Sequence, residues 1–341
     1  MRAIVYRETG DPSVLELVDR DAAEPGEGEV RVRIVVSGVN PTDWKSRAGA
    51  TGALAFPEIV PNQDSAGIVD AVGPGVDDFG VGDRVWLLLA AHGRPTGTAQ
   101  GLTVVPVDRV VRLPDNVSFD IGASLGVPAV TAHRALTVAE GGPSRLEPGT
   151  LAGRTVLVAG GAGAVGHAAI QLARWAGATV ITTISSPAKA SLATAAGAHH
   201  TVDYTADDPA GAIRAVAPDG VDLVVEVSPA TNAKLNHAVI ANHGTVSVYA
   251  NNGGDVLELD VRAHFALNIR YQFLLLYTLD LDALRAATED VTAAAEAGVL
   301  PVGDDAGLPL TRFPLERAAD AHAAVEGGVV GKVLIDVSAH A

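Results

Sequence analysis

TVLVAGGAGAVG, which spans Thr155–Gly166, decides the fold of this chain. An apolar run, Thr155–Ala159, breaks directly into glycines, and an Ala-rich helical pattern follows. Gly161, Gly163 and Gly166 satisfy the spacing G-x-G-x-x-G, which suits a strand, turn and helix that receive a dinucleotide pyrophosphate. The glycines allow a tight turn and close approach of the backbone, and the helix N-terminus offers free N–H groups to the anion. A Gly-rich turn with a purely structural role is the alternative.

The residues after this loop alternate between apolar runs and Ala-rich helical segments. The runs expected as further strands are Thr179–Ile184, Val221–Val227 and Thr245–Tyr249. Apolar runs separated by helices are what a parallel sheet covered on both faces requires. The pattern therefore predicts an α/β domain with a doubly wound parallel sheet over residues 124–278. Its expected pyrophosphate contacts are the consecutive loop residues Gly161, Ala162, Gly163, Ala164, Val165 and Gly166.

The first part of the chain has a different pattern of residues. Short runs such as Glu29–Val36 and Ser65–Val72 are apolar or alternate, and glycines punctuate them. Many short strands with frequent turns predict a barrel-like β unit over residues 1–123. A last short unit ends in Lys332–Val337, and a strand there can return to the first domain. We therefore expect residues 279–341 to complete the N-terminal domain.

The composition excludes several classes of protein. The chain has 341 residues, a formal net charge of −16 and no cysteine. The acidity argues against nucleic acid and anionic membrane surfaces as partners. The absence of cysteine removes disulfides, thiolate catalysis and Cys-based zinc sites. The first residues lack a hydrophobic signal core, and apolar runs such as Phe273–Tyr277 are too short to span a bilayer. A cytoplasmic protein is the expectation.

The second expected strand indicates which nicotinamide cofactor is used. NAD-binding folds usually place an acidic residue near its end, to accept from the ribose 2′-OH. No Asp or Glu occurs from Val180 to Val202; Ser185, Ser186 and Lys189 stand there instead. Small donors and one ammonium suit a 2′-phosphate, so the sequence favours NADPH. In the alternative, the serines cap a helix and Lys189 is a solvated residue.

Motifs along nearly the whole chain carry a resemblance to a known family. They are VNPTDWKSRAG (39–49), PNQDSAGIVDAVGPGV (61–76), VGDRV (81–85), GASLGVPAVTAHRAL (122–136), the glycine loop, GVDLVVEV (220–227) and GKVL (331–334). By these motifs the chain resembles the medium-chain dehydrogenase/reductase superfamily and, within it, the zinc-free, zeta-crystallin-like quinone oxidoreductases. The resemblance implies a Rossmann domain and a GroES-like β-barrel catalytic domain.

The same motifs lack the residues that bind zinc in other members of that superfamily. Zinc-dependent members have Cys in the first motif and a His-Glu pair in the second, where this chain has Asn40 and Gln63-Asp64. Neutral amides are poor zinc ligands, and one carboxylate does not make a site. We expect no metal.

The resemblance also implies which residues lie where the substrate reacts. It places Asn40 and Thr131 at the nicotinamide end, where Asn40, or a water held by Gln63, would donate to the oxygen that gains charge. Asn40 could instead form an Asx-turn before Pro41, and Thr131 could bond back to its own helix. Lys45 stands where many relatives have a cleft Tyr. It would favour a polar or acidic acceptor, unless it is a solvated helix residue.

Further cofactor contacts follow from the resemblance alone. The residues it assigns to NADPH, besides the loop, Ser185, Ser186 and Lys189, are Tyr204, Asn232, Ala250, Asn251, Phe273, Leu274, Leu275 and Lys332. Tyr204 would lie against the 2′-phosphate, and Lys332 near the phosphates or on the rim. The apolar run at Phe273 suits core or dimer contact equally well. In relatives this strand pairs across a two-fold axis, so the resemblance implies a homodimer.

Three functions compete at this point. The first is NADPH-dependent reduction of a small-molecule quinone or α,β-unsaturated carbonyl, by zinc-independent hydride or electron transfer. The second is zinc-free interconversion of an alcohol and a ketone, which needs a proton relay that the motifs do not supply. The third is a non-catalytic, NADPH-binding structural role. The sequence does not separate quinone from enone.

Overall fold

The computed structural model describes residues 1–50 and 52–338. Two compact units divide the chain: unit 1 comprises Met1–Val127 with Pro309–Ala341, and unit 2 comprises Pro128–Leu308. Helix α2 (Phe119–Leu136) crosses the first boundary. We expected the dinucleotide-binding domain to end at residue 278. Unit 2 instead ends at Leu308, so it contains one further helix. The reason is that α8 (Leu281–Glu296) holds the second half of α2 through a hydrogen bond between His133 and Asp290.

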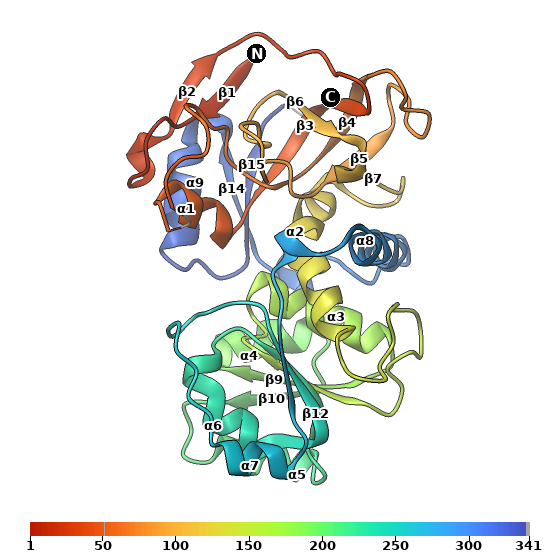
Figure 1. The fold of residues 1–341 in the computed structure, drawn as a ribbon, viewed down its shortest axis with the longest axis vertical. Coiled ribbons are helices and arrows are strands. Elements are labelled where there is room, and N and C mark those ends of the chain that lie inside the picture. The colour runs from red at the N-terminus through yellow and green to blue at the C-terminus, as the bar shows by residue number, and fades with distance from the viewer. Residues whose placement is uncertain (51, 339–341) are drawn as a thin grey trace. The chain divides into compact units, whose positions relative to one another are not determined.

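Unit 1 is a β structure, as its punctuated sequence predicts (Figure 1). Its strands are β1 (Arg2–Val5), β2 (Glu16–Asp19), β3 (Glu29–Val39), β4 (Asp64–Val72), β5 (Arg84–Leu87), β6 (Leu102–Pro106), β7 (Val110–Arg112), β14 (Leu310–Pro314) and β15 (Lys332–Asp336). Its other elements are α1 (Pro41–Arg47), α9 (Ala318–Glu326) and the 3-10 turns η1 (Pro12–Val14), η2 (Val107–Arg109) and η5 (Leu315–Arg317). The main sheet has the order β14-β15-β3-β4-β5-β7, with β6 also paired to β3.

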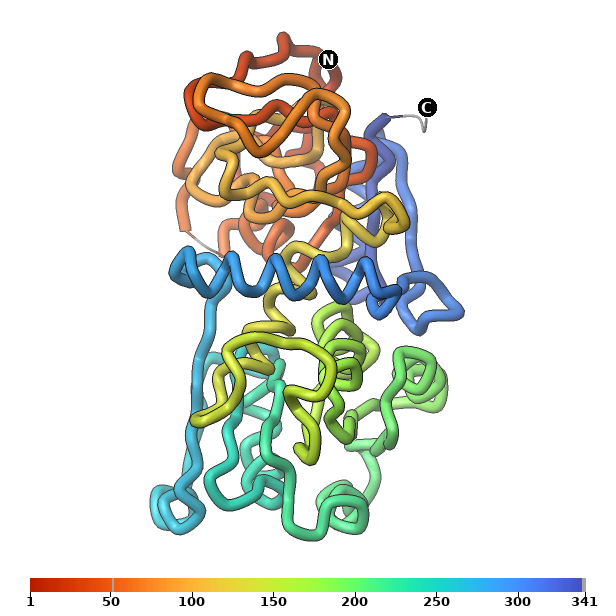
Figure 2. Tube along the Cα trace, turned by 90° about the vertical axis from the view of Figure 1, so that its right-hand side faces the viewer, coloured from red at the N-terminus to blue at the C-terminus, as the bar shows by residue number. Residues whose placement is uncertain are grey.

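The C-terminal strand returns to this sheet. β15 pairs antiparallel with β3, so that Val333 lies opposite Val39. In Figure 2 the blue C-terminal end of the chain accordingly lies beside the red and orange N-terminal segments. This pairing brings the first residue of β15, Lys332, next to the end of β3 and the start of α1.

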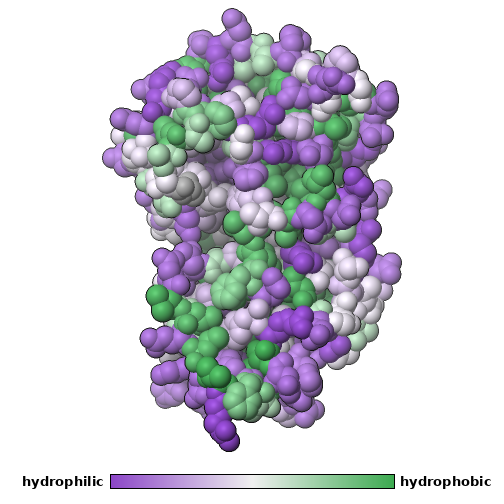
Figure 3. All heavy atoms as spheres, viewed as in Figure 1, coloured by the Kyte–Doolittle hydropathy of each residue, from purple (hydrophilic) through white to green (hydrophobic). Residues whose placement is uncertain are grey.

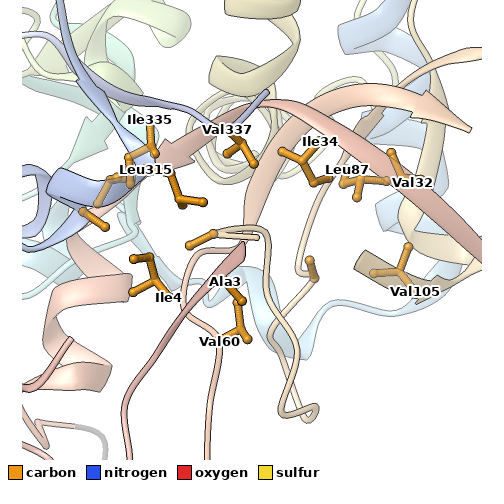
Figure 4. Close-up of a cluster of buried hydrophobic side chains, with 14 of the residues drawn as sticks. Ala3, Ile4, Val32, Ile34, Val60, Leu87, Val105, Leu315, Ile335 and Val337 are labelled. Atoms are coloured by element: carbon orange, nitrogen blue, oxygen red, sulfur yellow. The ribbon is translucent and has the colours of Figure 1, made fainter. Parts of the chain in front are cut away.

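The core of unit 1 follows from the period-two pattern of its strands. Val30, Val32 and Ile34 of β3 alternate in sequence and are each fully buried. They belong to one apolar cluster with residues of β1, β5 and β15, drawn in Figure 4 around Ile4, Leu87 and Ile335. Residues from both ends of the chain therefore build one core.

Unit 2 contains the predicted doubly wound sheet. Its parallel strands are β8 (Thr155–Ala159), β9 (Thr179–Ile184), β10 (His200–Asp203), β11 (Val221–Glu226), β12 (Ile240–Val248) and β13 (Arg270–Phe273). The order β10-β9-β8-β11-β12-β13 reverses direction at β8, which is the switch point where such sheets bind ligands. The remaining elements are α3 (Ala164–Trp175), α4 (Pro187–Ala195), α5 (Pro209–Val216), α6 (Pro229–Val239), α7 (Val261–Ala266), η3 (Leu276–Thr278) and η4 (Asp304–Ala306).

The helices of unit 2 begin where the sequence dictates. α4, α5 and α6 each start at a proline, whose missing N–H costs nothing at that position. The side chains of Ser186 and Asp208 accept the free N–H groups of α4 and α5. Each helix therefore starts directly after a strand and leaves the carboxyl edge of the sheet lined by short loops. Within the described residues no helix is long and apolar enough to cross a membrane.

Candidate functional site

The glycine loop joins β8 to α3 at the switch point of the unit 2 sheet. A Cβ on Gly161 would lie 2.2 Å from the Thr182 Oγ1, and one on Gly166 would lie 2.4 Å from the Gly160 carbonyl oxygen. Both glycines are therefore required for packing. At Gly163, the N-cap of α3, the nearest atom that a Cβ would meet among the described residues is 3.5 Å away. The folded chain therefore has room for a Cβ at Gly163, the position where the fingerprint expects the backbone to approach the pyrophosphate.

The residues expected to contact a 2′-phosphate gather at the end of β9. The Nζ of Lys189 donates to the Oγ of Ser185 over 3.0 Å, and the Ser186 Oγ accepts from the Lys189 backbone N–H. Tyr204 donates its backbone N–H to the carbonyl oxygen of Ile184, directly before Ser185. Its ring is 48% exposed. The end of β9 thus carries two hydroxyls and one ammonium, and the exposed Tyr204 lies next to them.

A pocket of about 490 Å³ opens at the carboxyl ends of β12 and β13. Five of the residues that the resemblance assigns to the cofactor line it: Ala250, Asn251, Phe273, Leu274 and Leu275. Apolar side chains form most of the remaining wall. A polar pair stands at its edge, where the Nδ2 of Asn251 donates to Asp255 over 2.5 Å. An apolar pocket with few polar groups at this sheet edge suits a planar ring.

Sequence reasoning missed two residues near this pocket. Glu226, at the end of β11, is fully buried, and it accepts from the Ser228 N–H and from the amides of Asn232 and Asn236. It therefore fixes the turn into α6 and directs the Nδ2 of Asn232 inward. Tyr249 lines the pocket, and burial, assisted by the Glu226 charge, raises the pKa of its phenol. The one signal for Glu226 was a carboxylate at the end of an apolar run.

The predicted catalytic residue of unit 1, Asn40, lies in a buried polar cluster. It follows β3, is 2% exposed, and its Nδ2 donates to the Oδ2 of Asp64 over 2.7 Å. Its Oδ1 accepts from the Nζ of Lys332, also over 2.7 Å. The Asn40 backbone N–H donates to Asp43, in the first turn of α1. Two charged residues distant in sequence, Asp64 and Lys332, thus hold the carboxamide of Asn40, and Asp43 holds its backbone N–H.

The electrostatics of this cluster follow from two carboxylates facing one ammonium out of water. Burial, and then the charge of Asp64, raise the pKa of Asp43 to about 8. Burial also raises the pKa of Asp64, while Lys332 and the Asn40 amide oppose that rise. Burial lowers the pKa of Lys332, and both carboxylates oppose it. Lys332 and Asp64 therefore oppose the effect of burial on each other's pKa, and the charge of Asp64 adds to the rise at Asp43.

The other residues predicted for the reaction and for the cofactor phosphates each have a defined local environment. The Oε1 of Gln63 accepts from the Ala91 N–H, which leaves its amide donors for other partners. Lys45 is half-buried on α1. Thr131 is buried in the part of α2 that belongs to unit 2. Lys332, which the resemblance assigns to the cofactor phosphates, has its ammonium directed at Asn40, Asp64 and the Val39 carbonyl.

These residues do not fit a zinc ion. Both oxygens of Asp64 accept from the Val127 N–H, and its Oδ2 lies 3.8 Å from the ammonium of Lys332. The neighbouring side chains are the amides of Asn40 and Gln63, which are poor zinc ligands. Among the described residues no group of three or more His, Cys, Asp or Glu side chains could hold a metal.

Comparison with known proteins gives two family-model matches. Residues 26–115 match the alcohol dehydrogenase GroES-like domain, and residues 164–292 match the zinc-binding dehydrogenase domain. A 2-haloacrylate reductase from Burkholderia sp is 29% identical over 98% of each chain. A quinone oxidoreductase from Rattus norvegicus is 30% identical over 98% of this chain and 97% of its own.

Solved structures agree in fold. A crystal structure named as an NAD-dependent alcohol dehydrogenase has a TM-score of 0.85 and 29% identity, over 99% of this chain and all of that one. A mycobacterial protein complexed with NADPH has a TM-score of 0.82 and 30% identity, over 98% of this chain and 99% of its own. The Rossmann sheet of unit 2 and the GroES-like sheet of unit 1 therefore have full-length counterparts.

Proposed function

Because this chain belongs to the quinone oxidoreductase family of the medium-chain dehydrogenase/reductase superfamily, we propose that it uses NADPH to reduce quinones or α,β-unsaturated carbonyls. Membership makes the chain an oxidoreductase; the cofactor and the acceptor are the proposal. The observation that carries it is the pocket at β12 and β13, which gathers Ala250, Asn251 and the run Phe273–Leu275 on the same sheet edge as the glycine loop.

The choice of NADPH rests on the corner at the end of β9. Lys189, Ser185 and Ser186 offer one charge and two hydroxyls where an NAD-binding sheet would carry a carboxylate. A phosphate dianion gains from charge-assisted hydrogen bonds to such groups, and a ribose hydroxyl gains little from the ammonium. The mycobacterial structure complexed with NADPH supports this choice.

The acceptor class rests on the apolar pocket and on the relatives. NADPH, when bound, would supply the hydride. By resemblance, the backbone of the segment Phe273–Leu275, which lines the pocket, would hold the carboxamide of the ring that gives it. The names of the relatives, a 2-haloacrylate reductase and a quinone oxidoreductase, support an activated C=C or quinone acceptor. Lys45 would favour an acceptor that carries a polar or acidic group.

In this proposal the reaction proceeds without zinc, and Asn40 acts where a metal would. Reduction of an enone or quinone places negative charge on the carbonyl oxygen. A positioned N–H donor stabilises that charge in a site from which water is excluded. The carboxamide of Asn40 keeps one Nδ2 hydrogen beyond the one given to Asp64, and Gln63 keeps its amide donors to hold a water. By resemblance we also assign Thr131 a role in the reaction.

One structural neighbour favours a second candidate. The structure named as an NAD-dependent alcohol dehydrogenase is as similar in fold as the reductases, so zinc-free alcohol/ketone chemistry is the alternative. A panel of acceptors separates the two: NADPH oxidation with 1,4-benzoquinone, 9,10-phenanthrenequinone, an enone and a simple ketone. We expect turnover with a quinone or the enone. Turnover with the ketone alone would overturn the proposal, and tight NADPH binding with no turnover would favour a structural role.

We also propose a homodimer through the free edge of β13. This strand ends the parallel sheet of unit 2, and its outer edge has no neighbouring strand among the described residues. Exposed apolar side chains lie close to it in sequence, among them Val261 and Phe265 of α7 and Phe273 of β13 itself. Figure 3 shows hydrophobic atoms gathered on the face of unit 2 that carries α6 and α7. An uncovered edge of this kind invites pairing with a second copy.

A further inference from the structure

Lys332 is a buried lysine. Its side chain is 1% exposed, and its Nζ lies 2.7 Å from the Oδ1 of Asn40, 3.3 Å from the Val39 carbonyl oxygen and 3.8 Å from the Oδ2 of Asp64. Taking an ammonium out of water is costly unless partners compensate it. An apolar side chain would fill the same space without that cost. The position therefore points to a use for the ammonium beyond filling the core.

The ammonium decides how the carboxamide of Asn40 is oriented. A lysine ammonium can only donate hydrogen bonds, and an ionised carboxylate can only accept them. Asn40 lies between the two, so its Oδ1 must face Lys332 and its Nδ2 must face Asp64. The opposite orientation would set two donors together at Lys332 and two acceptors together at Asp64. One Nδ2 hydrogen then remains, and its direction is fixed.

The rest of unit 1 holds this arrangement rigidly. The N–H of Val127 donates to both oxygens of Asp64 over 2.9 Å each. A Cβ on Gly126 would lie 2.2 Å from the Asp64 Oδ1, and one on Gly38 would lie 2.2 Å from the Ala123 carbonyl oxygen and 3.1 Å from the Nζ of Lys332. Both glycines sit in strand or helix and have negative φ, so close packing explains them better than turn geometry does.

We propose that Lys332 and Asp64 are positioning residues, which hold the Asn40 carboxamide so that its second Nδ2 hydrogen donates to the acceptor oxygen during reduction. This inference rests on the proposed function, and it gives Lys332 a task other than binding cofactor phosphates. It requires that loss of the ammonium lowers kcat for the acceptor while NADPH binds as before. A purely structural role would lower kcat and the amount of NADPH bound, each in proportion to the folded fraction.

The first experiment separates positioning from stability with a charge-balanced pair of variants. Lys332→Met leaves Asp64 as an uncompensated buried carboxylate, so we expect it to lower the melting temperature. Lys332→Met combined with Asp64→Asn removes both charges and restores much of that stability. We expect the double variant to bind NADPH like the wild type, yet to lose at least tenfold in kcat. Recovery of kcat together with stability would overturn the proposal. Lys234→Met, at an exposed site on α6, is the matched control.

The second experiment uses the absence of cysteine from the chain. Lys332→Cys can be alkylated in denaturant with bromoethylamine, which rebuilds a side chain of lysine's length with its ammonium, and then refolded. Bromopropane gives a side chain of the same length with a methyl group in place of the ammonium. We expect kcat to return with the aminoethyl form alone. Equal kcat in the two refolded forms would contradict a role for the ammonium.

A third readout does not depend on turnover. In protein labelled with 15N at asparagine, Asn40→Ser identifies the side-chain amide signals of Asn40. We expect two sharp, separate and slowly exchanging signals in the wild type, and averaged or rapidly exchanging ones in the double variant. Unchanged signals would overturn the positioning role. If the wild type shows them and reduces no acceptor, the proposed function fails and the positioning of Asn40 stands.

Discussion

The Nζ of Lys189 lies 3.0 Å from the Oγ of Ser185, at the edge of the unit 2 sheet where a dinucleotide's ribose is expected. An ammonium held against a hydroxyl presents two donors to the same anion.

Lys189→Ala tests the assignment of this corner to the 2′-phosphate. Loss of one charge-assisted hydrogen bond costs about 1.5–3 kcal/mol, so we expect the Kd for NADPH to rise by roughly 10- to 100-fold. The Kd for NADH should change little, because it lacks the phosphate. Fluorescence titration with both cofactors measures the ratio, and Lys234→Ala serves as the control. Equal weakening of the two cofactors would refute the assignment.

The glycine loop allows a matched comparison of two single-methyl changes. Gly161→Ala places its Cβ against Thr182 and should lower the melting temperature. Gly163→Ala has room in the folded chain and a negative φ, so its melting temperature should stay near that of the wild type. Its methyl group would instead obstruct the pyrophosphate, and we expect weaker binding of NADPH. Wild-type affinity in a folded Gly163→Ala variant would count against a phosphate at this position.

His167 gives unit 2 a pH-dependent stability. It lies in the second turn of α3, its Nε2 donates to the Ala306 carbonyl oxygen, and burial lowers the pKa of its ring from 6.5 to about 4. Between these values the unfolded chain binds a proton that the folded chain does not, so stability falls as pH falls from about 6.5 to about 4. The loss amounts to about 3 kcal/mol. His167→Gln can keep the hydrogen bond without titrating, and urea unfolding over this range should show a flatter pH profile. Identical profiles would contradict the assignment.

Chelation tests the absence of a catalytic metal. The ammonium of Lys332 and the N–H of Val127 already occupy Asp64, so we expect full activity with a quinone after dialysis against a strong chelator. Elemental analysis of the active protein should find no stoichiometric zinc. Activity that chelation abolishes and zinc restores would overturn the zinc-free mechanism.

Light scattering tests the dimer. A chain of 34.7 kDa should run at about twice that mass. Val261→Glu with Phe265→Glu places two charges on exposed apolar positions of α7, and we expect this variant to dissociate. Val81→Glu, at a position in unit 1 that is 71% exposed, should leave the mass unchanged. A wild-type monomer at micromolar concentration would contradict the proposal.

Much of the fold could be predicted because its signals are local. The glycine loop and the apolar runs of β8 and β9 lie within a few residues of the elements they specify. The carboxyl ends of parallel strands then meet at one edge, so Ser185 could be placed on it from its strand end, whereas Ala250 and Leu274 were assigned by the resemblance.

What could not be predicted depends on contacts between distant parts of the sequence. Lys332 and Asn40 are 292 residues apart. Taken alone, Lys332 has the pattern of a residue on the rim of the cofactor site, and Asn40 that of a turn residue before a proline. The boundary near residue 278 differed for the same reason. The amphipathic pattern of α8 does not say which unit it packs on, whereas its Asp290 bonds His133, Arg145 and Leu146, which all belong to unit 2. Glu226 was missed for a different reason: its donors are local, the farthest being Asn236, but they converge on one carboxylate only when α6 has formed.

The place of β15 has a consequence for synthesis of the protein on the ribosome. All of unit 2 is translated before Pro309, whereas unit 1 lacks β14 and β15 until residues 310–336 have been made. At roughly 5–20 residues per second, Asp64 therefore waits about 13 seconds or more for the lysine ammonium that pairs with it. The nascent chain carries all of the dinucleotide-binding unit only once Leu308 has been made, and Asn40 acquires its orientation after Lys332 has been made and β15 has paired with β3.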